Sequence, residues 1–345
     1  MVLDYLKGFS ALYIVLHHMR DYFPIQEISK PLLSFGQEAV VVFLLISGFT
    51  NFYSLNRTEF KFGLYIRKKI QRIYPLLLFT LLVTWMIGGM SWGGYKSICQ
   101  LVGNVLNLSS VNADVFFEVR PWMSNLPLWS LTYIWWYYFL IGLYKRFIGD
   151  GEKLIGVFLL IAIVGEVTYK LCPTVISLIL IYSFILATGS YVCWCIMHEV
   201  FTLKRVFGIV GAYISIMAIH CLLFLNDFMS FTVSQHFQFP YCEIRHFGVA
   251  TLLIVLIYVI KCFHLTSYFE IVFKPFGVLA SFSYALYIIH FNLKKTLMSI
   301  DIGINPYLQL ILTIIIICTI AYFMEVYLQK WVVGLFARNK QNKHL

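Results

Sequence analysis

Two ionisable residues in the first apolar segment are of types that could take part in catalysis within the membrane. Lys7 and His18 are separated by ten residues. In a helix this spacing places both side chains on one face, about 16 Å apart, because each residue rises about 1.5 Å. An ionisable side chain inside a membrane span costs about 2.5–3.5 kcal/mol, so its presence there suggests a function. Lys7 and His18 are therefore the candidate catalytic residues.

The imidazole of His18 is suited to activating a hydroxyl group. Imidazoles titrate near neutral pH, so this side chain is a candidate general base. The structural alternative is a histidine at the end of a span that forms hydrogen bonds near the lipid headgroups. His17 points to a different face of the same helix, which makes it the natural control residue.

A second group of ionisable residues lies just before the third apolar segment. Arg67, Lys68, Lys69 and Arg72 precede Ile73-Tyr74-Pro75. Lys69 and Arg72 are neighbours if the segment is helical, because they are three residues apart. Lysine and arginine bind phosphates well, so these four residues form a candidate binding site for a phosphorylated cofactor. They are also suited to setting the topology and to contacting anionic lipids.

Small and aromatic residues interrupt two other apolar segments. Ser47 and Gly48 favour close packing of helix backbones more than nucleophilic catalysis. Trp129 and Ser130 begin an aromatic run whose rings are suited to packing or to anchoring at the membrane interface. We assign Ser47, Trp129 and Ser130 a supporting or substrate-binding role.

The last polar group lies near the C-terminus. Ser283 and Tyr284 are followed by Tyr287 and His290, and the last two share a helical face because they are three residues apart. His290, like His18, is expected in the outer half of the membrane. Two outer histidines and an inner basic cluster predict a donor that enters from inside and reacts deeper in the membrane.

The composition shows which elements must position these residues. Apolar residues make up 60% of the 345 residues and charged residues 12%, whereas soluble domains have about 45–50% and 25%. We therefore predict an all-α integral membrane protein. The net charge of +10 is explained by basic residues in cytoplasmic loops, and nothing resembles a basic surface for nucleic acid.

Segments of about 20 apolar residues can cross the hydrocarbon layer. We predict a bundle of about ten transmembrane helices in one domain, residues 1–330, followed by a short basic cytoplasmic tail, 331–345. Most of the 26 Lys and Arg residues then lie on the inner side, which places both termini in the cytoplasm. The segment 93–122 is expected to form a small outer cap. The predicted spans are 3–22, 36–55, 73–92, 123–143, 154–170, 174–195, 206–225, 246–263, 277–296 and 306–329.

The eight cysteines indicate no metal or redox chemistry. Most of them lie in or beside apolar runs, where a thiol behaves as a small apolar side chain. No Cys/His spacing is typical of a zinc site, so we predict no metal. A disulfide between Cys99 and Cys242 is possible. The first apolar segment has no small-x-small site and is expected to be an uncleaved span.

In order along the chain, five stretches resemble the acyltransferase-3 family of polytopic membrane O-acyltransferases. The interval from Lys7 to His18 matches the family's Arg, ten residues, His pattern, with Lys in place of Arg. Many members have Glu after the Trp-Ser-Leu block, where this chain has Ile134 and Trp135. The other four matching stretches are 43–49, 67–75, 129–131 and 283–290.

The resemblance implies transfer of an acyl group, commonly acetyl from acetyl-CoA, to a hydroxyl of a cell-envelope polysaccharide or lipid-linked glycan. It implies that His18 acts in catalysis, that Lys69 and Arg72 contact the CoA phosphates, and that the protein lies in a bacterial cytoplasmic membrane. The alternatives are a transporter of a glycan or lipid-linked sugar and an inactive scaffold. The acceptor sugar, the acyl chain and the oligomeric state are not specified by the sequence.

Overall fold

The computed structural model describes residues 2–23, 25–57, 59–88, 95–111, 119–230, 239–301 and 303–341. Helices and turns make up these residues, and no strand occurs among them. The all-α class is therefore confirmed. Parts of the predicted cap, namely 93, 94 and 112–118, and the tail residues 342–345 lie outside the described residues.

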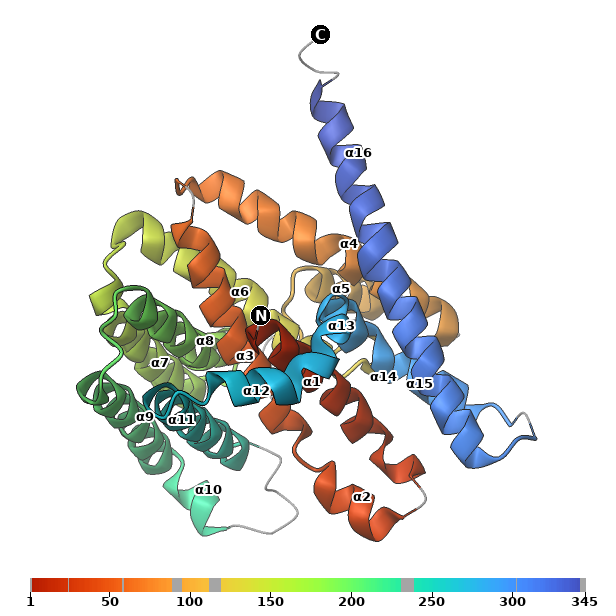
Figure 1. Ribbon diagram of the computed structural model, residues 1–345, viewed down its shortest axis with the longest axis horizontal. Coiled ribbons are helices and arrows are strands. Elements are labelled where there is room, and N and C mark those ends of the chain that lie inside the picture. The colour runs from red at the N-terminus through yellow and green to blue at the C-terminus, as the bar shows by residue number, and fades with distance from the viewer. Residues whose placement is uncertain are drawn as a thin grey trace.

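Twelve of the described α-helices have more than ten residues and form the bundle drawn in Figure 1. Shorter helices connect or flank them. The bundle helices and their flanking helices are α1 (Val2–Met19), α2 (Gln26–Leu32), α3 (Gly36–Asn56), α4 (Phe62–Gly88), α5 (Tyr95–Val105), α6 (Leu128–Phe147), α7 (Leu154–Leu171), α8 (Val175–Met197), α9 (Leu203–Leu223), α10 (Leu225–Met229), α11 (Tyr241–Cys262), α12 (Thr266–Phe273), α13 (Gly277–Ala280), α14 (Ser283–Ser299), α15 (Pro306–Phe323) and α16 (Gln329–Gln341).

Seven helical segments in the described residues are long and apolar enough to cross a membrane. An eighth is counted if the segments 266–280 and 283–299, which meet at 69°, form one broken span. The predicted number of about ten is not confirmed. The spans expected at 3–22 and 123–143 form α1 and α6, but polar residues in α1 and the many Trp and Tyr rings of α6 lower their hydropathy.

The helices alternate in direction, so the polar residues gather at two ends of the bundle. At one end, which we call the basic end, residues from the first three turns of α1, α4 and α14 lie near Glu325, in the π-helical turn Met324–Leu328 that follows α15. At the other, the histidine end, the last turns of α1 meet α14, and Tyr287 of α14 meets the first turns of α6. The predicted cytoplasmic location of both termini stays a prediction.

Helices α3 and α8 pack at the closest approach that glycine allows. A Cβ atom on Gly48 would lie 1.9 Å from the carbonyl oxygen of Leu186, and one on Gly189 would lie 2.0 Å from that of Leu45. Only residues without a side chain fit at such contacts. This geometry explains the small residues near Ser47, which is itself buried.

The structure also bears on the predicted disulfide and shows where the predicted tail begins. Cys99 and Cys242 are both free thiols, so the disulfide that the sequence allowed is absent between these described residues. The predicted tail begins inside α16, and Figure 1 shows α16 in line with α15 and projecting beyond the other helices. The five-residue π-helical turn Met324–Leu328 joins these two helices.

Candidate active site

Three cations gather at the basic end of the bundle. The Lys7 ammonium lies 3.4 Å from the hydroxyl of Thr50 on α3, and it is close enough to Arg72 to interact with it electrostatically. Lys69 interacts electrostatically with both Lys7 and Arg72. Its ammonium lies 4.2 Å from the centre of the Tyr138 ring. Because like charges repel, such a group of cations favours an anionic ligand.

Only two of the four predicted phosphate-binding residues belong to this cluster. Lys69 and Arg72 lie on the same side of α4 as the buried Tyr65; Lys69 is half-buried, and the exposed Arg72 pairs with the buried Glu325. Arg67 and Lys68 are exposed on the other faces of the helix. The rotation of about 100° per residue along a helix explains this division.

Glu325 is a member of the basic end that the sequence analysis did not identify. Its side chain is 2% exposed, and its two oxygens have different partners. One oxygen forms an ion pair with Arg72, and the other accepts a hydrogen bond of 2.8 Å from the backbone N–H of Ala285 in α14. The rule that drew attention to Lys7, an ionisable side chain within an apolar span, applies equally to Glu325 in 306–329.

His18 and His290 meet at the histidine end. Their ring centres are 5.2 Å apart and the rings are inclined by 29°, so they stack. The ammonium of Lys294 donates to the backbone oxygen of His18 at 3.0 Å. His17 also contacts the ring of His18, but its Nδ1 faces the backbone oxygen of Leu33, 2.5 Å away, beyond the end of α2.

The protonation of His290 follows from its neighbours. Its side chain is fully buried, and its Nδ1 faces the backbone oxygens of Tyr287 at 2.8 Å and Leu286 at 3.1 Å. Carbonyl oxygens only accept hydrogen bonds, so Nδ1 carries the hydrogen and Nε2 keeps its lone pair. Nε2 has no hydrogen-bond partner among the described residues, which makes it a buried acceptor nitrogen near the ring of His18.

The predicted stretches 129–131 and 283–290 are in direct contact. The hydroxyls of Ser130 and Tyr287 are 2.6 Å apart. Ser283 and Tyr284 lie nearer the basic end, where the Tyr284 hydroxyl donates to the backbone oxygen of Ile73 at 3.2 Å. Helix α14 therefore runs from the basic end to the histidine end, as α1 does.

Residues 2–326 match a family model described as an acyltransferase domain. The chain belongs to the acyltransferase-3 family. The comparisons with curated proteins and with solved structures each found no match.

This acyltransferase-3 protein has a second buried polar cluster beside Trp129, which the sequence analysis also missed. The ring of His246 stacks on Trp129 with centres 6.3 Å apart. The hydroxyl of Tyr182 lies 2.7 Å from Nδ1 of His246 and donates to Glu243 at 3.3 Å. One oxygen of the fully buried Glu243 has no hydrogen-bond partner among the described residues. The sequence feature that could have identified this cluster is Glu243 itself, a single carboxylate at the edge of an apolar span.

A buried ion pair lies near this cluster. Nδ1 of His220 is 2.7 Å from a carboxylate oxygen of Glu166, and neither side chain is exposed. After the Trp-Ser-Leu block, where the resemblance led us to expect Glu, this chain has the buried Ile134 and the half-buried Trp135. The carboxylate beside the Trp129 rings therefore comes from α11, as Glu243, and not from α6. Groups of His, Cys, Asp and Glu that could hold a metal are absent from the part of the chain that is described.

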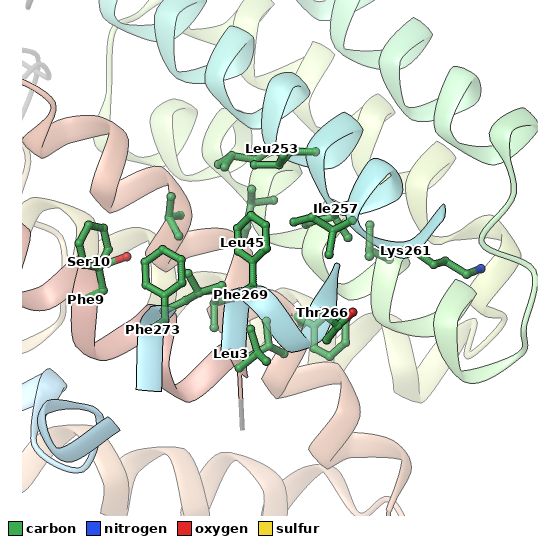
Figure 2. A pocket seen from close by; sticks show the side chains of 18 of the residues that line it. Leu3, Phe9, Ser10, Leu45, Leu253, Ile257, Lys261, Thr266, Phe269 and Phe273 are labelled. Atoms are coloured by element: carbon green, nitrogen blue, oxygen red, sulfur yellow. The ribbon is translucent and has the colours of Figure 1, made fainter. Parts of the chain in front are cut away.

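A large apolar groove lies on another face of α1. Figure 2 shows Leu3 and Phe9 of α1 opposite Leu253 of α11, with Phe269 and Phe273 of α12 across one side. Its volume is 1300 Å³, and none of the predicted site residues lines it. A lining of this kind suits hydrocarbon chains and not the phosphates of a donor. The candidate residues Lys7, His18 and His290 do not line this groove.

Proposed function

We propose that this acyltransferase-3 protein moves an acetyl group from acetyl-CoA to a hydroxyl of a cell-envelope polysaccharide or lipid-linked glycan. The observation that carries the proposal is the pair of stacked imidazoles on α1 and α14, two helices whose first turns lie near a cluster of cations. The family supports an acyltransferase role. The donor, the acceptor and a bacterial cytoplasmic membrane are parts of the proposal.

The basic end is suited to hold the donor. Lys69 and Arg72 lie on one side of α4, and the side chain of Arg72 is 50% exposed, so its guanidinium is accessible to a phosphate. Lys7 adds a third cation. With the phosphates held here, the thioester must extend about 16 Å along α1 to reach His18. In this arrangement the basic end faces the cytoplasm, where acyl-CoA is found.

The histidine end is suited to activate the acceptor. His18 removes the proton from the acceptor hydroxyl, and the oxygen attacks the thioester carbonyl. The carbon–sulfur bond then breaks, and the sulfur of CoA leaves and takes up the proton from His18. Nε2 of His290, a lone-pair nitrogen beside His18, helps to orient the hydroxyl. The acceptor approaches past Trp129, Ser130 and the cluster around Glu243.

Purified protein in vesicles of phosphatidylethanolamine and phosphatidylglycerol tests the proposal. The assay follows labelled acetyl from acetyl-CoA into an envelope glycan fraction, and mass spectrometry of the glycan identifies the group transferred. His18→Ala is expected to abolish transfer, whereas His17→Ala is expected to retain it. A fully active His18→Ala enzyme would defeat the catalytic assignment.

A transporter of a glycan or lipid-linked sugar is the second candidate. The buried chain of ionisable residues that includes Glu166, His220 and Glu243 favours it, because such residues line transport pathways in membranes. The same vesicles separate the two functions. Uptake of a labelled sugar without acetyl transfer would support transport, and acetyl transfer that needs His18 would support the enzyme. If the protein shows neither activity and does not bind CoA, the result would support the inactive scaffold.

A further inference from the structure

Glu325 and Arg72 form an ion pair whose two members differ sharply in exposure. The carboxylate side chain is 2% exposed, whereas the side chain of Arg72 is 50% exposed. A phosphate that approaches Arg72 from solution therefore meets a guanidinium that is already paired. Guanidinium groups bind carboxylates and phosphates through the same donors, so the two anions compete for Arg72.

The surrounding charges allow the carboxylate to exchange its partner. Lys7 interacts electrostatically with both Arg72 and Glu325. Leaving a buried carboxylate without a cation is strongly unfavourable. If a phosphate binds Arg72, Glu325 can pair with Lys7 and remain neutralised, so the exchange is possible without burying an unpaired charge.

We propose that Glu325 limits the affinity for a phosphorylated donor by holding Arg72 until a phosphate displaces it. A thioester that bears phosphates can take Arg72 from the carboxylate, whereas a thioester without phosphates cannot. This inference rests on the proposed function, because it concerns the donor of the same reaction. Glu325 is a positioning residue that acts through Arg72, and it does not contact the reacting atoms.

The second bond of Glu325 connects this exchange to the histidine end. Its other oxygen accepts from the backbone N–H of Ala285, in the first turn of α14. Tyr287 and His290 follow on the same helix within about one and a half turns. Glu325 lies in the π-helical turn Met324–Leu328, a type of turn that is frequent at functional sites. The Glu325 carboxylate therefore joins Arg72 to the helix that carries His290.

The experiment compares two donors, acetyl-CoA and acetyl-pantetheine, which has the same thioester but no phosphates. Glu325→Gln keeps an oxygen for the N–H of Ala285 and removes the charge that competes for Arg72. KM for acetyl-CoA is expected to fall about three- to tenfold, with kcat within about twofold, and KM for acetyl-pantetheine is expected to stay unchanged. Glu59→Gln, which removes an exposed charge near the start of α4, is the matched control and should change neither KM.

Two further variants distinguish competition for Arg72 from a purely structural role of Glu325. In an Arg72→Gln background, Glu325→Gln should have no additional effect on KM for acetyl-CoA, because the competition has already been removed. Glu325→Asp keeps the charge on a shorter side chain and should lower this KM less than Gln does. Equal shifts of KM for both donors, or a higher KM for acetyl-CoA in Glu325→Gln, would overturn the inference.

Binding to the His18→Ala protein separates this inference from the proposed function. Calorimetry with CoA and with pantetheine should show that Glu325→Gln tightens the binding of CoA alone by about three- to tenfold. If CoA does not bind to the protein with the native Glu325, the donor assignment of the proposed function fails. If CoA binds with the same Kd whether residue 325 is Glu or Gln, the donor assignment stands and the inference about Glu325 fails.

Discussion

Replacing His290 by Phe tests whether this buried imidazole is retained for function. Nε2 has no hydrogen-bond partner among the described residues, and burying such an acceptor costs about 1–3 kcal/mol. A phenyl ring of similar shape removes this cost. It also removes the bond from Nδ1 to the carbonyls of Leu286 and Tyr287, whose loss costs about 0.5–1.5 kcal/mol.

The difference between these two effects gives a magnitude for His290→Phe. The variant is expected to be between equally stable and about 2 kcal/mol more stable than the native protein. Acetyl transfer should nevertheless fall at least about 100-fold, since orienting and proton-transfer groups contribute about 10²–10⁴-fold. A residue whose removal stabilises the fold and abolishes activity is typical of a functional site.

Thermal unfolding in detergent, followed by tryptophan fluorescence, measures the stability, and labelled acetyl-CoA measures the activity. His198→Phe is the matched control, because Nδ1 of His198 also bonds a carbonyl one turn back, that of Trp194 at 2.9 Å, but on an exposed surface. This control should keep its activity. Transfer within threefold of the native rate in His290→Phe, or a loss of stability above about 2 kcal/mol, would refute the account of Nε2.

Three other substitutions have defined outcomes. Lys69→Gln should raise KM for acetyl-CoA about tenfold, which corresponds to one charge-assisted contact, whereas Arg67→Gln should change it less than twofold, as steady-state kinetics will show. Gly48→Leu should lower the unfolding temperature strongly, because a Cβ there meets a backbone oxygen at 1.9 Å; Gly63→Leu, with open space around its Cα, should not. Glu243→Gln should raise KM for the glycan and leave KM for acetyl-CoA unchanged, and an unaltered glycan KM would exclude Glu243 from acceptor binding.

The sequence predicted which stretches matter better than it predicted their partners. The position of a residue within its span sets its depth in the membrane, so His18 and His290 were both expected in the outer half. In the structure their rings are in contact. Which faces of two helices meet depends on packing across the whole bundle. The contacts of Glu325 with Arg72 and of Glu243 with Tyr182 join residues distant in the chain, and no local pattern specifies them.

Two other differences have local causes. Arg67 and Lys68 were grouped with Lys69 and Arg72 because they are consecutive, yet helical rotation separates them onto different sides of α4. The number of spans was set by counting long segments low in charge. Helix α6 is low in charge, but its Trp and Tyr rings make it less apolar than a lipid-facing span, as befits a helix with many buried residues.

The glycine contacts between α3 and α8 restrict where this protein can change shape. Backbones that touch at Gly48 and Gly189 cannot slide past one another without a clash of main-chain atoms. These two helices therefore form a rigid wall on one side of α1. Any rearrangement during a catalytic cycle falls to the opposite side, where α14 begins after a 69° bend and α15 ends in a π-helical turn.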